Sequence, residues 1–83
     1  MAQRGTTDLA TIRTIVKKHF QRKLEITDET SLVGGGLIDS MALVDLILDL
    51  EEASGVKITI GEVEPEDFDS VLKIAATLDR FRA

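Results

Sequence analysis

Apolar residues recur at helical spacing in three stretches of this chain. In the first stretch they repeat at i, i+3, i+7 and i+11, at Leu9, Ile12, Val16 and Phe20. Thr6 or Thr7 suits the N-cap of a helix here, with Asp8 in its first turn. Cations crowd the far end, where they suit the helix dipole, so we expect the helix to stop near Arg22 or Lys23.

A long connection follows, over residues 24–38. We expect Ile26, Leu32 and Val33 to hold it against the core. The three consecutive glycines at 34–36 then give the backbone wide conformational freedom. Loops of this length are uncommon in compact domains and are usually functional or disordered.

The second helical stretch begins at Asp39–Ser40 and runs to about Ser54, with Gly55 as a natural stop. Beyond it, apolar positions alternate at Val56, Ile58 and Ile60. Alternation is typical of a strand, but no second strand pattern exists to pair with it. We therefore predict an extended loop that packs on the core.

The third stretch completes the fold. Pro65 opens a short helical turn that ends at Phe68, which we expect to be a buried anchor. Asp69 or Ser70 caps the last helix, whose core face is Val71, Ile74, Ala75, Leu78 and Phe81. The pattern predicts an all-α fold, a small four-helix bundle of three main helices and one short third helix, with a long first loop. We expect residues 1–6 to form a flexible tail and residues 7–83 to form one domain.

The second helix has two apolar faces. One is a normal core face, formed by Leu43, Leu46, Ile47, Leu50 and Ala53. The other, on the opposite side, is a stripe formed by Met41, Val44 and Leu48. Four acids lie beside this stripe: Asp45, Asp49, Glu51 and Glu52. Either the long loop or the last helix covers the stripe, or it is an exposed docking surface rimmed by acids.

The charge pattern bears on the same question. The net charge of −5 comes from 15 acids and 10 bases. Residues 1–23 carry six bases and one acid, residues 24–69 thirteen acids and one base, and residues 70–83 three bases and one acid. The basic ends either neutralise the acidic middle within the fold or leave it free to steer a basic partner.

Composition excludes several classes of function. The acidic balance disfavours a nucleic-acid binder, and the absence of cysteine excludes disulfides and thiolate metal sites. No apolar run is long enough to span a bilayer, and residues 1–8 do not form a signal peptide, so we expect a cytoplasmic protein. The small core leaves little room for a deep pocket, which favours a carrier or adaptor over an enzyme.

Ser40 lies where the glycine-rich loop meets the second helix. Either Ser40 caps this helix, or Asp39 caps it and leaves the Ser40 hydroxyl free, at a position that suits an attached phosphodiester. A catalytic role for the serine is disfavoured, because the only histidine, His19, belongs to the first helix as a surface or boundary residue. We predict no catalytic residues and no metal ligands.

The segment from Gly36 to Met41, Gly-Leu-Ile-Asp-Ser-Met, resembles the Asp-Ser-Leu/Met attachment motif of acyl carrier proteins. The resemblance extends over residues 7–82 and includes the order of helices and the acidic second helix. It implies that Ser40 carries 4′-phosphopantetheine, added from coenzyme A, with Asp39 supporting the modification. The thiol of that group would hold an acyl or aminoacyl cargo as a thioester.

The resemblance also implies partners. They are a phosphopantetheinyl transferase, an adenylating ligase or acyltransferase that loads the cargo, and a downstream transferase or synthase, all met by a monomeric carrier. The expected partner-binding residues lie at the start of the second helix and along it: Leu37, Ile38, Met41, Val44, Asp45, Leu48, Asp49, Glu51 and Glu52.

Two features differ from the carriers of bacterial fatty-acid synthesis and favour another branch of the family. Ala42 follows Asp-Ser-Met, where bacterial fatty-acid carriers usually have an acid, and the first helix is unusually basic. The pentad Gly-Leu-Ile-Asp-Ser is closer to D-alanyl carrier proteins and other stand-alone carriers. We therefore favour a specialised carrier, for an amino acid or an acyl group. The alternative is an unmodified helical adaptor that docks basic partners through its acidic second helix.

Overall fold

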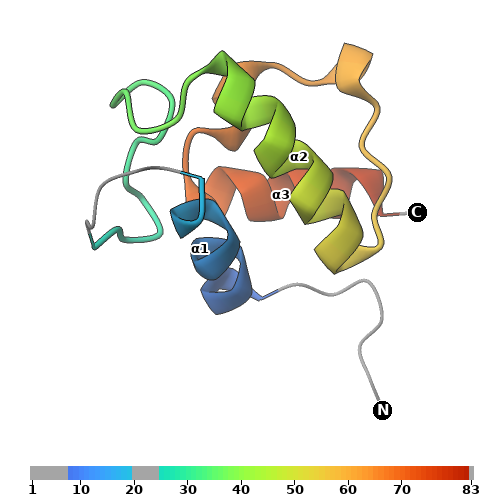
Figure 1. Cartoon of the computed structure of the whole chain (residues 1–83). Coiled ribbons are helices and arrows are strands. Elements are labelled where there is room, and N and C mark those ends of the chain that lie inside the picture. The colour runs from blue at the N-terminus through green and yellow to red at the C-terminus, as the bar shows by residue number, and fades with distance from the viewer. Residues whose placement is uncertain (1–7, 20–24, 83) are drawn as a thin grey trace.

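The fold is all-helical over the residues that the structure describes. A computed structural model describes residues 8–19 and 25–82 of the chain. Its elements, in chain order, are α1 (Leu9–Lys17), α2 (Ser40–Ser54), the 3₁₀ turns η1 (Ile60–Glu62) and η2 (Pro65–Phe68), and α3 (Val71–Phe81). In Figure 1, α2 passes in front of α3, and α1 lies against both. The predicted all-α bundle with a short helix before the last one is confirmed, and η1 is an additional turn.

The first helix differs from the prediction at both ends. Asp8 is its N-cap, because the Asp8 carboxylate accepts a hydrogen bond from the Thr11 N–H at 2.9 Å. The helix ends at Lys17, where the Lys18 and His19 N–H groups bond three residues back and tighten the last turn. The predicted cap at Thr6 or Thr7 and the predicted end near Arg22 or Lys23 are therefore wrong. Those four residues, Phe20 and the predicted tail lie outside the described residues.

The core contains most of the residues that the pattern placed there. Each α-helix contributes one face, the loop before α2 contributes Ile26 and Leu32, and the segment after it contributes Val56 and Ile58. Phe68 is fully buried, as predicted for the anchor of η2. Three predictions are wrong: Ile60 and Ala53 are exposed, and Val33 is only partly buried. Ala75 and Phe81 pack partly buried against the core.

Side chains of α2 hold the segment that follows the helix. Gly55 takes the left-handed conformation, with φ +73°, and ends the helix as predicted. The buried Ser54 hydroxyl donates to the Leu50 carbonyl at 2.6 Å and accepts from the Val56 N–H at 3.1 Å. Glu51 accepts from the Ile58 N–H at 2.7 Å. These bonds explain how residues 56–58 stay extended without a strand partner.

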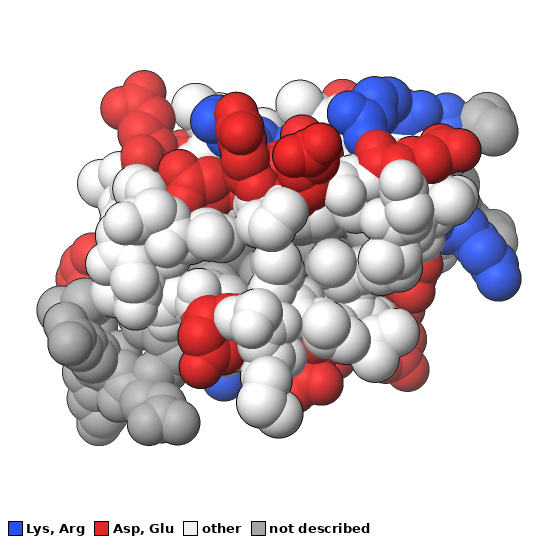
Figure 2. All heavy atoms as spheres, turned by 90° about the horizontal axis from the view of Figure 1, so that it is seen from above, with Lys and Arg blue, Asp and Glu red and all other residues white. Residues whose placement is uncertain are grey.

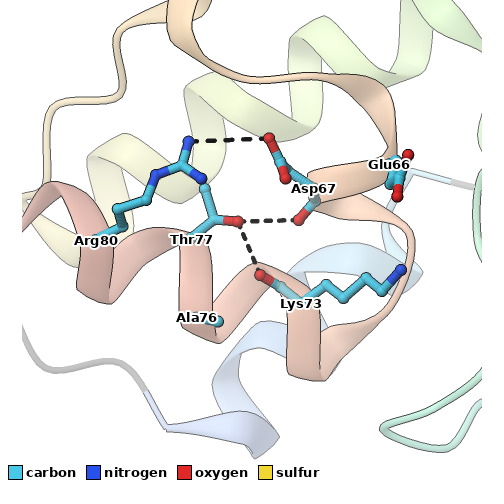
Figure 3. A pocket seen from close by; sticks show the side chains of 6 residues that line it. All are labelled: Glu66, Asp67, Lys73, Ala76, Thr77 and Arg80. Carbon is cyan, nitrogen blue, oxygen red and sulfur yellow. Dashed lines mark hydrogen bonds and ion pairs between the residues drawn. The ribbon is translucent and has the colours of Figure 1, made fainter.

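The last helix is capped by Ser70, whose hydroxyl accepts from the Lys73 N–H at 3.1 Å. Figure 3 shows how η2 is fixed against this helix. The Thr77 hydroxyl lies 3.1 Å from the Asp67 carbonyl oxygen and 2.9 Å from that of Lys73, and Arg80 lies 3.9 Å from the Asp67 carboxylate. A shallow hollow of about 310 Å³ lies beside these contacts, and Asp67, Thr77 and Arg80 in its lining are already engaged with one another or with the backbone.

Candidate functional site

Asp39 and Ser40 divide two tasks at the start of α2. The Asp39 carboxylate accepts from the Ala42 N–H at 2.8 Å, so Asp39 is the N-cap. Ser40 is the first helical residue and is exposed. Within residues 8–19 and 25–82 its hydroxyl has no hydrogen-bond partner. Of the two arrangements that the sequence left open, the structure has the one in which Asp39 caps and the Ser40 hydroxyl is free.

The other serines are already engaged. Ser54 and Ser70 are buried, with exposed fractions of 3% and 7%, and their hydroxyls bond the backbone. The Ser31 hydroxyl donates to the Asp69 carboxylate and lies 3.0 Å from each oxygen. Ser40 is therefore the serine whose hydroxyl is both exposed and unengaged among the described residues.

A phosphodiester fits this position. The positive end of the α2 dipole lies at Ser40 and favours a negative group attached there. The Asp39 carboxylate is turned to its own helix by the bond to Ala42. The residues present thus fit a covalently attached phosphate.

The approach to Ser40 is a closed loop. The Leu32 carbonyl oxygen accepts from the N–H groups of both Leu37 and Ile38, at 2.9 and 3.1 Å. Gly36, with φ +76°, allows the backbone to turn back so that Leu37 reaches Leu32. Ile38 is only 2% exposed, so its side chain belongs to the core, and the prediction that it contacts partners is wrong. Leu37 is partly buried and packs against the core.

The base of this loop is held by Asp69, which the sequence suggested only as a helix cap. One Asp69 oxygen accepts from the N–H groups of Val33 and Gly34, each at 2.8 Å. The Asp69 carbonyl oxygen accepts from the Leu32 N–H at 2.5 Å. The bond from the Gly34 N–H, with those from Ser31 and Val33, holds the pKa of Asp69 below its ordinary value.

The second apolar face of α2 is open to solvent. Met41 is 80% exposed, Val44 53% and Leu48 57%. Neither the loop nor α3 covers them, so the alternative of a buried stripe is wrong. Figure 2 views the molecule from the side where α2 begins, and acidic groups lie around an uncharged central area there. An open apolar strip near acids is the anatomy of a docking surface.

The four acids predicted to rim the stripe separate into two pairs. Asp45 and Glu52 are exposed, and no hydrogen bond or ion pair engages either of them among the described residues. Glu51 instead accepts the Ile58 N–H, and the Asp49 carboxylate lies 2.7 Å from the His19 imidazole. Sequence reasoning missed both contacts, because Glu51 bonds a segment beyond the end of its own helix and His19 lies 30 residues from Asp49.

Basic residues of α1 are also engaged internally. Arg13 pairs with Asp28 and Lys17 lies 3.7 Å from Glu25, so cations of the first helix meet acids of the loop. Neutralisation within the fold thus accounts for part of the charge pattern, while Asp45 and Glu52 stay free for a partner. In the described part of the chain no three metal-ligating side chains gather, and no helix is long and apolar enough to cross a membrane.

A free serine at a loop–helix junction, beside an acid-rimmed apolar strip, is the arrangement expected of a carrier protein. Comparison with known proteins agrees. The family described as the phosphopantetheine attachment site matches residues 10–78. The D-alanyl carrier protein of Streptococcus pyogenes serotype M5 is 33% identical over 58 residues, 70% of this chain and 72% of its own length. That of Streptococcus suis is 30% identical over 64 residues, 77% of this chain and 81% of its own.

The chain therefore belongs to the phosphopantetheine-binding, acyl-carrier family and resembles the D-alanyl carriers. Its prosthetic group is covalently attached 4′-phosphopantetheine, and its function is to carry acyl or aminoacyl groups. Proteins of this family are not enzymes, and they work with enzymes that modify and load them.

Proposed function

We propose that Ser40 is the residue that carries the 4′-phosphopantetheine. The observation that supports this most is the exposed Ser40 hydroxyl, left free because Asp39 caps α2. In the transfer, the Ser40 oxygen bonds to the phosphorus that bears pantetheine, and the pyrophosphate bond of coenzyme A breaks. Adenosine bisphosphate leaves with the electron pair, and the hydroxyl proton passes to a base of the transferase. The chain has no cysteine, so the thiol of the attached group is the one that forms the thioester with the cargo.

Asp39 has a supporting role in this proposal. Its bond to the Ala42 N–H fixes the first turn of α2 and so presents the Ser40 hydroxyl outward. The exposed strip of Met41, Val44 and Leu48, with Asp45 and Glu52, forms the docking surface for the transferase and for the loading and accepting enzymes. Partly buried Leu37 extends this surface. Asp49 and Glu51 contribute to it indirectly, because their bonds to His19 and to the Ile58 N–H fix α2 against its neighbours.

The cargo belongs to the same proposal. Similarity to two proteins named D-alanyl carrier proteins favours an aminoacyl cargo over a long fatty acyl chain. An adenylating ligase is then the loading enzyme, and the carrier serves a specialised pathway. A monomeric, cytoplasmic carrier whose domain covers residues 7–83 stays our prediction.

Intact mass spectrometry tests the proposal. Apo protein is incubated with coenzyme A and a broad-specificity phosphopantetheinyl transferase. We expect wild type to gain one phosphopantetheinyl group, and Ser40→Ala to gain none. A gain that survives Ser40→Ala would place the attachment elsewhere.

The alternative is an unmodified adaptor that uses the same acidic surface. It predicts that Ser40→Ala leaves function intact, whereas reversal of Asp45 and Glu52 to Lys abolishes it. The carrier proposal predicts that both changes abolish loading, because modification and docking are both required. A loading assay of the wild type separates the two functions, because an unmodified adaptor has no thiol on which a cargo could be loaded.

A further inference from the structure

Asp69, distant from Ser40 in the chain, grips the loop that leads to it. Its carboxylate accepts from the Val33 and Gly34 N–H groups and from the Ser31 hydroxyl. One carboxylate thus accepts from three donors that lie within four residues of a single loop. These bonds are not needed to start α3, because Ser70 already caps that helix.

The far end of the same loop positions the serine. Leu32, held at its N–H by the Asp69 carbonyl, uses its own carbonyl to hold the N–H groups of Leu37 and Ile38. Asp39, which caps α2, comes next in the chain. A continuous set of hydrogen bonds therefore runs from Asp69 through Leu32 to the residues that precede Ser40.

The loop also packs so closely on itself that two of its positions favour glycine. A Cβ at Gly35 would lie 2.3 Å from the Ser31 carbonyl oxygen, closer than any side chain tolerates. A Cβ at Gly34 would lie 2.9 Å from the Ser31 hydroxyl that donates to Asp69. The glycines thus let the loop fold closely around the carboxylate, a use that their conformational freedom alone did not reveal.

We propose that Asp69 is a positioning residue for phosphopantetheinyl transfer, because it holds residues 31–38 in the form that the transferase recognises. The inference rests on the proposed function. Loss of the carboxylate leaves α2 and the core intact but lets the loop sample other forms. The apparent affinity for a partner falls in proportion to the fraction of molecules in the competent form.

Steady-state kinetics with the full apo chain as varied substrate, at saturating coenzyme A, tests this. For Asp69→Ala we expect a rise of about tenfold in the KM for the carrier, as when the competent fraction falls to about a tenth, with kcat unchanged. Asp69→Asn keeps an oxygen for the Val33 and Gly34 N–H groups and is expected to restore most of the affinity. Asp79→Ala, at an exposed position on α3, is the matched control and leaves KM unchanged.

Gly35→Ala disturbs the loop from its other side and is expected to raise KM as Asp69→Ala does. It decides the question if Asp69→Ala fails to fold. Unchanged KM in folded variants, or a loss confined to kcat, would overturn the inference. If wild type itself gains no phosphopantetheine, the proposed function fails instead, so the two failures are distinguishable.

Discussion

The His19 imidazole Nε2 lies 2.7 Å from the Asp49 carboxylate, which joins the turn after α1 to the middle of α2. The His19 side chain is 13% exposed and that of Asp49 39%. The only histidine of the chain is thus engaged by a carboxylate from another helix. It is one half of a tie between two helices, and Asp49 is the other half.

Removal of either partner is expected to lower the free energy of unfolding. A hydrogen bond to a charged group contributes about 1.5–3 kcal/mol net when it is well buried. Because the Asp49 side chain is 39% exposed, solvent screens the contact, and we expect a coupling energy of about 1 kcal/mol between the two residues. Urea unfolding of His19→Ala, Asp49→Ala and the double variant measures it. Additive effects of the two substitutions would show that the contact does not contribute.

Glu51 and Glu52 are adjacent acids with different roles. Glu51→Ala is expected to cost about 1 kcal/mol, because the Ile58 N–H loses the carboxylate that it donates to. Glu52→Ala is expected to leave the free energy of unfolding unchanged and to weaken partner binding instead, since Glu52 is exposed. Equal effects of the two substitutions on stability would contradict this division.

The division of tasks between Asp39 and Ser40 predicts opposite phenotypes. Asp39→Ala removes a helix cap and is expected to cost about 1 kcal/mol of stability. Ser40→Ala removes a hydroxyl that bonds nothing in the described chain, and its effect on stability is expected to stay within about 0.5 kcal/mol. Thermal unfolding of both variants provides the comparison. Greater destabilisation by Ser40→Ala would mean that Ser40 is the cap.

The exposed stripe gives a prediction about partners. Val44→Asp is expected to leave the fold intact, because Val44 is already half exposed, and to block modification or loading. Circular dichroism checks the fold and a loading assay the function. Leu46→Asp, at a fully buried position of the same helix, is the contrasting variant and is expected to unfold the protein. Unfolding of the Val44 variant would show that the stripe is part of the core.

Acid should weaken the grip of Asp69 on the loop. The pKa of Asp69 is lower in the folded protein than its ordinary value, chiefly because the carboxylate accepts the Gly34 N–H. Its contribution to stability is therefore complete above the unfolded pKa, near pH 4, and is lost as the pH falls through the lower folded pKa. The stability difference between wild type and Asp69→Asn should shrink as pH is lowered from 6 to 3. A difference that does not change with pH would argue against the shift.

Periodicity predicted most of the fold because the residues involved act locally. Gly55 ends α2 because glycine readily adopts a positive φ, and Pro65 opens η2 because its fixed φ suits a first helical position. Phe68 is buried because its side chain is large and apolar. The start of α1 was misplaced by a residue or two because Thr6, Thr7 and Asp8 are all good caps. Ile60 was placed in the core by alternation, but η1 interrupts the extended segment at that residue.

The site was predictable where chemistry depends on neighbours in the chain. Asp39–Ser40 could be found from the motif, and the stripe from the angular positions of Met41 and Val44. Gly34 and Asp69, which are hydrogen-bonded, lie 35 residues apart in the chain. His19 and Asp49 lie 30 residues apart. Only the packed helices bring such pairs together, and no local pattern encodes them.

Mapping the modified residue tests the central claim most directly. Wild-type protein modified with coenzyme A and the transferase is digested, and the fragments are sequenced by tandem mass spectrometry. We predict that the phosphopantetheinyl group lies on Ser40 alone, and that Ser31, Ser54 and Ser70 are unmodified. A group found on another residue, or a chain that stays unmodified while related carriers are modified in parallel, would contradict the account.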